Sequence, residues 1–248
     1  MHIIKLSKEH PTLPLAELRA VLGACYPEEK AVIKIENDRV TLLGIDDVSK
    51  LGKRLAYAMG INGEELKQGF DQRYPRKRPF SHPTTLDPKL ARCMVNLAQP
   101  DSGAQIFDPF CGTGGILLEA GLMGFKTIGI DIDSKMIEGC KKNLDHYGVK
   151  NFDITVDDFF KTKKRGVIVT DPPYGKSTSL PGKTVEEFYN LILERLHVIM
   201  KLGTLACIGS PTTINFTEMT KNQGFTVKEE HIVYDNQDLS KRIVVLGR

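Results

Sequence analysis

The sequence lacks the features that would place it in a specialised class of protein. Its 248 residues contain no run of 18 apolar residues that could span a membrane, and the short apolar start does not fit a secretory signal. No internal repeat or low-complexity tract occurs. The formal net charge of +3 is too small to indicate a nucleic-acid partner, so any such contact must come from local clusters. These absences favour a globular cytoplasmic protein without a membrane partner.

Cysteine is also scarce and poorly placed for bonding. The five cysteines are an odd number, lie far apart and include no C-x-x-C pair, so we expect neither a disulfide framework nor a metal site. Cys111 lies in a glycine-rich loop, but no histidine near it in the sequence would activate a thiolate, and we interpret it as a small packed residue. Cys207 lies within an apolar run and is expected in the core.

Residues 1–66 predict a small α+β domain with the order strand, helix, strand, strand, helix. The first helix follows Thr12, whose side chain suits a cap, and the second continues at helical spacing from Val48 to Met59. Nothing in this part has a catalytic pattern. The strand patterns lie at residues 2–6, 31–35 and 39–43.

A change in composition marks residues 67–80, which we interpret as a basic linker between two domains. One interpretation is a strip that binds an RNA backbone and stacks its bases. The alternative is a solvated linker whose apolar stems pack on the neighbouring domain. The sequence leaves both open. The basic residues are Lys67, Arg73, Arg76, Lys77 and Arg78, and the aromatic residues between them are Phe70 and Tyr74.

Residues 81–248 alternate strand and helix patterns, which predicts a parallel sheet with helices on both faces. The last two strand patterns, 225–234 and 242–246, have no helix between them and predict an antiparallel pair at one edge of the sheet. The other strand patterns are at 104–107, 127–130, 153–156, 167–170 and 205–209, and the helix patterns are at 89–98, 115–123, 134–147, 184–201 and 213–223.

A glycine-rich loop, Asp108 to Gly115, follows the first of these strands. Small residues let the backbone approach a ligand, and the next helix presents unpaired N–H groups and the positive end of its dipole, so a nucleotide-like ligand fits there. Asp131 ends the next strand, 17 residues after Gly114, where an acidic residue can accept both hydroxyls of a ribose. An NAD enzyme would share these two features.

Two further segments separate a methyl donor from a dinucleotide. Asp157 and Asp158 end the third strand, where they either face an adenine amino group or form an ordinary exposed turn. Residues 82–85 precede a helix and are expected to cover the methionine end of S-adenosylmethionine, although His82 fits a loop histidine with its own partners equally well.

A second short segment, Asp171-Pro172-Pro173-Tyr174-Gly175, follows the strand pattern at 167–170. The prolines fix φ and supply no N–H, so the loop is stiff and offers oxygen acceptors but few donors, which suits an amino group with two hydrogens. Tyr174 could stack on the ring that carries this amine, worth roughly 1–3 kcal/mol per base, and the base must leave its stack to enter. A plain turn has the same composition, but the position 63 residues after Asp108 favours a reaction site.

These segments together resemble the archaeal and eukaryotic tRNA guanosine-10 N2-methyltransferases. The motifs that carry the resemblance are residues 107–120, 129–133 and 171–175, with His82-Pro83 and residues 91–98 upstream. The resemblance implies an α/β, seven-stranded class I (Rossmann-like) methyltransferase fold, S-adenosylmethionine as donor, and methylation of a guanine amine in tRNA. It assigns cofactor binding to Asp108, Gly112, Gly114, Asp131 and Asp157, and catalysis to Asp171, Pro172, Pro173 and Tyr174. We also predict cofactor contacts for Thr85, Ile132 and Asp158.

The N-terminal part is similar to the ferredoxin-like domain that opens members of this family. The span from Ile61 to Pro79 is too short for the RNA-binding THUMP domain that usually follows, so we do not expect this chain to bind tRNA on its own. Several relatives work with a small zinc-binding activator subunit, and the resemblance implies such a partner besides tRNA. Two other readings stay open: DNA adenine-N6 or protein glutamine methylation, and an inactive RNA-binding subunit.

Overall fold

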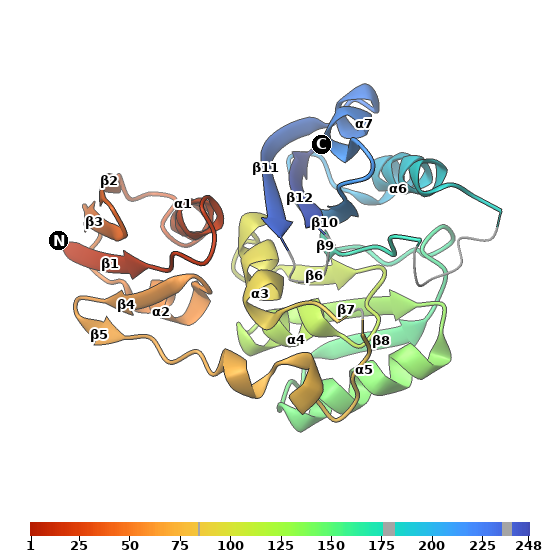
Figure 1. The fold of residues 1–248 in the computed structure, drawn as a ribbon, viewed down its shortest axis with the longest axis horizontal. Coiled ribbons are helices and arrows are strands. Elements are labelled where there is room, and N and C mark those ends of the chain that lie inside the picture. Colours follow the sequence, from red (N-terminus) through yellow and green to blue (C-terminus); the bar gives the residue numbers. More distant parts are fainter. Residues whose placement is uncertain (84, 176–181, 235–239) are drawn as a thin grey trace.

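The computed structural model describes residues 1–83, 85–175, 182–234 and 240–248, and its strands form two sheets. A five-stranded sheet is built from the N-terminal part and a seven-stranded sheet from the rest. The chain runs from one to the other through an extended segment after residue 65 (Figure 1). The predicted linker, residues 67–80, therefore falls between the two sheets.

The N-terminal sheet has the strand order of a ferredoxin-like fold. Its elements are β1 (His2–Leu6), α1 (Leu13–Cys25), β2 (Val32–Glu36), β3 (Arg39–Leu43), α2 (Ser49–Arg54), β4 (Ala58–Ile61) and β5 (Glu64–Glu65). All pairs are antiparallel, in the order β2-β3-β1-β4-β5. Without the short β5, the chain follows the β-α-β-β-α-β sequence of that fold.

Two expectations for this part are wrong. The helical spacing over residues 48–59 overruns α2, which ends at Arg54, because Ala58 already begins β4. The apolar residues of the overlap fit a helix and a buried strand alike, and the pairing of β4 with β1 decides between them. Thr12 occupies the cap position of α1 without making the cap hydrogen bond. Its hydroxyl instead lies 2.8 Å from Nδ1 of His231.

The larger sheet is parallel at its centre and antiparallel at one edge. Its strands are β6 (Gln105–Asp108), β7 (Lys126–Asp131), β8 (Phe152–Val156), β9 (Val167–Thr170), β10 (Leu205–Pro211), β11 (Thr226–Tyr234) and β12 (Ser240–Gly247). The order is β11-β12-β10-β9-β6-β7-β8, and β12 pairs antiparallel with β10 and β11. The predicted antiparallel pair is confirmed. The strand order reverses between β6 and β9, and open α/β sheets bind ligands at such a point.

Helices cover both faces of this sheet, as the alternation predicted. They are α3 (Pro88–Leu97), α4 (Gly115–Leu122), α5 (Ser134–His146), α6 (Val185–Ile199) and α7 (Phe216–Asn222). One apolar cluster joins α3 and α4 to one face, and a second joins α6 and α7 to the other. None of the helices in the described ranges is both long and apolar enough to cross a bilayer.

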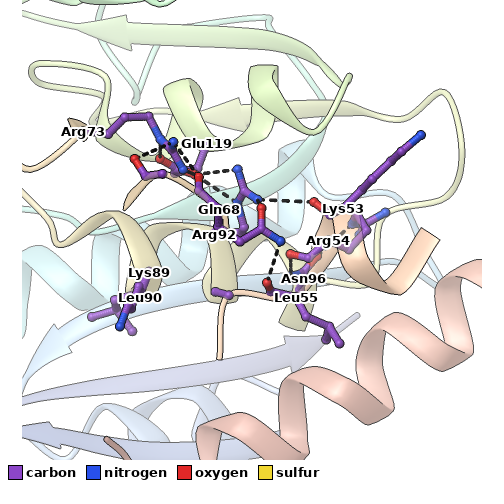
Figure 2. A network of polar contacts seen from close by, with 12 residues as sticks. Lys53, Arg54, Leu55, Gln68, Arg73, Lys89, Leu90, Arg92, Asn96 and Glu119 are labelled. Carbon is purple, nitrogen blue, oxygen red and sulfur yellow. Dashed lines mark hydrogen bonds and ion pairs between the residues drawn. The ribbon is translucent and has the colours of Figure 1, made fainter. Parts of the chain in front are cut away.

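A buried ion-pair network anchors the linker to the larger sheet's helices (Figure 2). Glu119 on α4 is fully buried. Its Oε1 lies 2.6 Å from Nε of Arg73 in the linker, and its Oε2 lies 2.9 Å from Nη2 of Arg92 on α3. Arg92 also donates to the side chain of Gln68, at 2.7 Å. The linker is thus held by charges that lie out of contact with water.

A second polar cluster joins α1 and α2 to α3. Glu17 on α1 is fully buried and accepts hydrogen bonds from the backbone N–H groups of Ala56 and Tyr57. Asn96 on α3 donates to Glu17 at 2.7 Å and accepts from Nε of Arg54 at 2.9 Å. The N-terminal part therefore contacts the rest of the protein through hydrogen-bonded buried polar side chains as well as apolar packing.

These networks correct the RNA-binding interpretation of the basic strip for three of its residues. Arg73, Arg78 and Phe70 are buried. A guanidinium that is packed inside the protein cannot meet a phosphate on the surface. The exposed members of the strip, for which both interpretations stay open, are Lys67, Arg76 and Lys77.

Candidate active site

Two acidic residues meet where the strand order reverses. Asp108 ends β6 and Asp171 directly follows β9, its neighbour in the sheet. Thr170 donates its hydroxyl to Oδ1 of Asp108 at 2.6 Å. Burial raises the pKa of Asp108 to about 7, and the nearby charges of Asp171 and Asp131 add to the effect. The sequence predicted this meeting of strand ends, and the structure brings the two loops together.

The glycine-rich loop needs glycine at two positions. Gly112 has φ +49° and Gly114 has φ +83°, a region that other residues rarely adopt. A Cβ on Gly114 would lie 2.5 Å from Sγ of Cys140, whereas a Cβ on Gly112 would meet nothing within 4 Å. The loop is therefore packed on one side by α5 and borders open space on the other.

Asp131 fixes this loop in place. Its Oδ2 accepts from the backbone N–H of Gly112 at 3.0 Å, and its Oδ1 accepts from that of Asp133 at 2.9 Å. Partial burial raises the pKa of Asp131. The next residue, Ile132, is 78% exposed, which leaves its side chain available to pack on a flat ligand. Asp131 and Ile132 therefore lie next to the open side of the glycine-rich loop.

Asp157 and Asp158 lie beside Asp131 but use their carboxylates within their own turn. The backbone N–H of Asp157 donates to the carbonyl oxygen of Asp131 at 3.1 Å. Oδ1 of Asp157 accepts from the N–H of Asp158, and a hydrogen bond from Thr162 lowers the pKa of Asp157. Asp158 accepts from the N–H of Phe160. Their position fits an adenine contact, while their bonds fit a turn, so the cofactor role stays a prediction.

The segment upstream of α3 reaches the glycine-rich loop through Thr85. Its hydroxyl donates to the carbonyl oxygen of His82 at 2.7 Å and lies 3.1 Å from the hydroxyl of Thr113. Thr84, which falls within the predicted segment, lies outside the described residues. The contact with Thr113 places Thr85 where the sequence predicted it, next to the cofactor loop.

Neither of the two cysteines considered in the sequence has the character of a nucleophile. Cys111 is 5% exposed, and a hydrogen bond with Cys140 together with burial raises the pKa of its thiol. Cys207 is fully buried within β10, and burial raises its pKa as well. A thiol with a raised pKa carries little thiolate at neutral pH, which agrees with the interpretation of Cys111 as a packing residue.

The loop at residues 171–175, here called the reaction loop, holds the carboxylate of Asp171 between two side chains. Tyr174 donates its hydroxyl to Oδ1 of Asp171, and Nζ of Lys241 lies 2.9 Å from Oδ2. The carbonyl oxygen of Pro172 accepts from the hydroxyl of the fully buried Tyr189, at 3.3 Å. The loop is thus held at the Asp171 carboxylate by Tyr174 and Lys241, and at its backbone by Tyr189.

Three residues that shape this loop were not among the predicted site residues. Lys241 lies 70 residues from Asp171 in the chain, and Tyr189 is one of many apolar positions on α6, so neither gave a local signal. Gly209 did give one, because an isolated glycine inside a strand indicates close approach of another group. A Cβ at Gly209 would overlap Oδ1 of Asp171.

Residues 75–241 match a family model described as RMKL-like, methyltransferase domain. The chain belongs to the RMKL-like methyltransferase family. The predicted class of enzyme is therefore confirmed, and so is the resemblance to the tRNA guanosine-10 N2-methyltransferases, because curated relatives carry that name.

The protein named tRNA (guanine(10)-N2)-dimethyltransferase from Methanothermobacter thermautotrophicus is 41% identical over 238 residues, which cover 93% of this chain and 68% of that protein. Its namesake from Pyrococcus abyssi is 41% identical over 224 residues, covering 84% of this chain and 66% of that protein. The tRNA (guanine(10)-N(2))-methyltransferase of Saccharomyces cerevisiae is 34% identical over 118 residues, 42% of this chain and 27% of that protein. This RMKL-like methyltransferase spans about two thirds of the length of the two archaeal relatives.

Solved structures share the fold. TrmN from Thermus thermophilus superposes with a TM-score of 0.57 at 17% identity, covering 99% of this chain and 81% of that one. SMU.472 in complex with SAH gives a TM-score of 0.58 at 14% identity, covering 100% of this chain and 98% of that one. At these identities the likeness shows the fold alone, and it confirms the class I methyltransferase fold that the sequence predicted.

Proposed function

We propose that this protein transfers a methyl group from S-adenosylmethionine to the exocyclic 2-amino group of a guanine in tRNA, at position 10. The observation that carries the proposal is the place of Asp171. A stiff acidic loop lies beside Asp108 at the point of strand reversal, and next to it lies the glycine-rich loop. The names of the curated relatives supply the position and the nucleic acid.

The residues of the glycine-rich loop fit S-adenosylmethionine. The open space beside Gly112 gives a ligand access to the backbone, and the carboxylate of Asp131 adjoins it. Asp131 would hold the ribose hydroxyls, the exposed Ile132 would pack on the adenine ring, and Thr85 would lie at the methionine end. When bound, the cofactor supplies an electrophilic methyl group on a positively charged sulfur. Asp108 brings a carboxyl group to the same end of the sheet, and a cation bound there would favour its charged form over the neutral form that burial favours.

The reaction loop would hold the acceptor amine. A ring-bound amino group is a weak nucleophile, because its lone pair is delocalised into the ring. Accepting its two hydrogens at Asp171 and at the carbonyl oxygen of Pro172 directs the lone pair away from the loop, and positioning of this kind supplies much of the rate enhancement. Tyr174 would give up its hydrogen bond to Asp171 and stack on the base. The proton that leaves the nitrogen passes to Asp171 or to water.

We further propose that the protein acts in the cytoplasm on tRNA, with a small zinc-binding subunit as partner. Within the strip, the support for RNA contact comes from the exposed basic residues Lys67, Arg76 and Lys77, since Phe70, Arg73 and Arg78 are buried. A partner that adds RNA-binding surface would complement so small a patch. Pull-down of the tagged chain from its own cells tests this: full activity of the isolated chain without a bound zinc protein would contradict it.

Methyl transfer to unmodified tRNA tests the proposed function. The purified protein, with and without the co-purified partner, is incubated with donor labelled in the methyl group and a tRNA transcript that has guanine at position 10. Digestion to nucleosides should yield labelled N2-methylguanosine or N2,N2-dimethylguanosine. Label in methyladenosine, or in added protein instead of RNA, would contradict the proposal.

A further inference from the structure

Lys241 brings a positive charge to the reaction loop from a distant strand. It lies near the start of β12, and its Nζ is 2.9 Å from Oδ2 of Asp171. The two side chains are 13% and 15% exposed, so the pair is largely removed from water but still reached from one side. Nζ also lies 5.5 Å from the centre of the Tyr174 ring. The cation therefore borders both the carboxylate and the ring that the proposed function assigns to the base.

The ion pair with Asp171 does not use all the hydrogen-bond donors of the Lys241 ammonium group. An ammonium group has three N–H donors, and in the described part of the chain one of them has an acceptor, the carboxylate of Asp171. A polar group that is mostly out of water is costly unless its donors are satisfied. The remaining acceptors must come from water in the free protein and from the substrate once water has been displaced.

The Watson–Crick edge of guanine supplies an acceptor for Lys241 and donors for Asp171. Along the Watson–Crick edge, O6 accepts a hydrogen bond, N1–H donates one, and the 2-amino group donates two. Adenine has the opposite order at the first two positions, because its 6-amino group donates and its N1 accepts. A carboxylate beside an ammonium is complementary to the guanine order and not to the adenine order, as required when a flipped base is read by its Watson–Crick edge.

We propose that Lys241 donates a hydrogen bond to O6 of the target guanine while Asp171 accepts from N1–H and the 2-amino group. Lys241 is then a specificity-determining residue, and before the substrate enters it holds the carboxylate of Asp171 in orientation. This inference rests on the proposed function, because it concerns the same site, and it adds the group that distinguishes guanine from other amines.

The test compares two tRNA transcripts that differ only at position 10, where one has guanine and the other 6-thioguanine. The sulfur analogue keeps N1–H and the methyl-accepting amine but replaces O6 by a weak acceptor. We expect wild-type kcat/KM to favour guanine by roughly tenfold or more, as for loss of a hydrogen bond to a charged group. Lys241→Met should lower this preference to about twofold or less, and Lys241→Arg, which keeps charged donors, should restore most of it. Lys228→Met, an exposed lysine on the adjacent β11, is the matched control and should keep the wild-type preference.

Each preference is a ratio within one protein, so a general loss of activity does not alter it. Wild-type protein that methylates both transcripts equally, or a Lys241→Met variant that keeps the wild-type preference, would overturn the role of Lys241 and leave the proposed function standing. No transfer to the guanine transcript by wild-type protein with its partner would overturn both. If Lys241→Met does not fold, Lys241→Gln takes its place with the same expectation.

Discussion

Two carboxylates in this protein show how differently the same chemical group can be used. Glu119 is fully buried at the junction of the linker with the larger sheet's helices, between Arg73 and Arg92. Asp171 lies at the carboxyl end of β9, is 15% exposed, and pairs with Lys241. One carboxylate holds parts of the chain together, and the other faces the site where the proposed chemistry takes place.

The difference lies in the acceptor positions that remain. A carboxylate has about four positions for hydrogen bonds. Glu119 accepts hydrogen bonds from Nε and Nη2 of Arg73 and from Nε of Arg92, and Nη2 of Arg92 forms an ion pair with its Oε2 at 2.9 Å. In the described residues Asp171 accepts from Tyr174 and Lys241, so two positions remain for an incoming ligand. Three hydrogen bonds from two buried guanidiniums mark Glu119 as a structural carboxylate. Asp171 keeps more free acceptor positions and lies beside the cofactor loop, so it can bind substrate.

The largest effect is expected at Asp171. Asp171→Ala should lower methyl transfer by about 10²–10⁴-fold, because the amine loses its acceptor, while the Kd for S-adenosylmethionine changes little. Single-turnover transfer and calorimetric titration measure the two quantities separately. Asp145→Ala, an exposed acid on α5, is the control and should behave as wild type. Parallel loss of cofactor binding and turnover in Asp171→Ala would mean that the residue belongs to the cofactor site instead.

The other half of the comparison predicts a loss of stability. Glu119→Gln leaves two buried guanidiniums without their counter-charge and should cost about 3–5 kcal/mol in the free energy of unfolding. The matched control is Glu9→Gln, which breaks the exposed ion pair with Lys89 and should cost less than about 1 kcal/mol. Urea unfolding of the three proteins measures both. Equal stability of the two variants would contradict the structural role assigned to Glu119.

The pH dependence of stability sharpens the comparison, because each region holds one further buried acid. Burial raises the pKa of Glu17 at the junction and of Asp108 at the site to about 7. Both pKa values lie above those of the unfolded chain, so the folded protein binds more protons between about pH 4 and pH 7. Stability should therefore fall as the pH rises through this range, by on the order of 3 kcal/mol for each group, and level off above it.

Glu17→Gln separates the two contributions. The variant should lose about half of the decrease between roughly pH 4 and pH 8, measured as the difference in unfolding free energy from urea titrations. An unchanged decrease would assign the whole effect to Asp108 or to other groups.

The smallest effect is expected on RNA binding by the linker. Replacing Arg76 and Lys77 together by Ala should weaken tRNA binding a few-fold at low salt and reduce the slope of log K against log salt by roughly 1 to 2, since both side chains are exposed. Arg73→Ala should instead destabilise the fold, because Arg73 pairs with Glu119. Filter binding over a salt series checks the first statement; an unchanged slope would assign the exposed residues to the linker alone.

The pattern of the sequence predicted most of the larger sheet and the acidic ends of its strands. Alternating strand and helix patterns require a parallel sheet, and parallel strands end at one edge, so Asp108, Asp131 and Asp171 had to lie close together. The loop residues carry their own signal in glycine and proline, whose backbone preferences are local. Such features are readable because they need no knowledge of distant partners.

The residues whose roles the sequence left open or missed depend on partners far away in the chain. Arg73 and Arg78 have the composition of an RNA-binding strip, and only the position of Glu119, 46 residues after Arg73, shows that this charge is buried. Lys241 reaches Asp171 only because β12 folds back beside β10. Charge can be read from a sequence, but whether water or a buried counter-charge satisfies it depends on tertiary packing.

The most direct test of the central claim removes a single amino group from the substrate. Two tRNA transcripts, one with guanine and one with inosine at position 10, differ only in the 2-amino group that Asp171 and Pro172 are proposed to hold. With labelled donor and the same amount of enzyme, we expect transfer to the guanine transcript and none above background to the inosine transcript. Equal labelling of both would place the methyl group elsewhere and contradict the account.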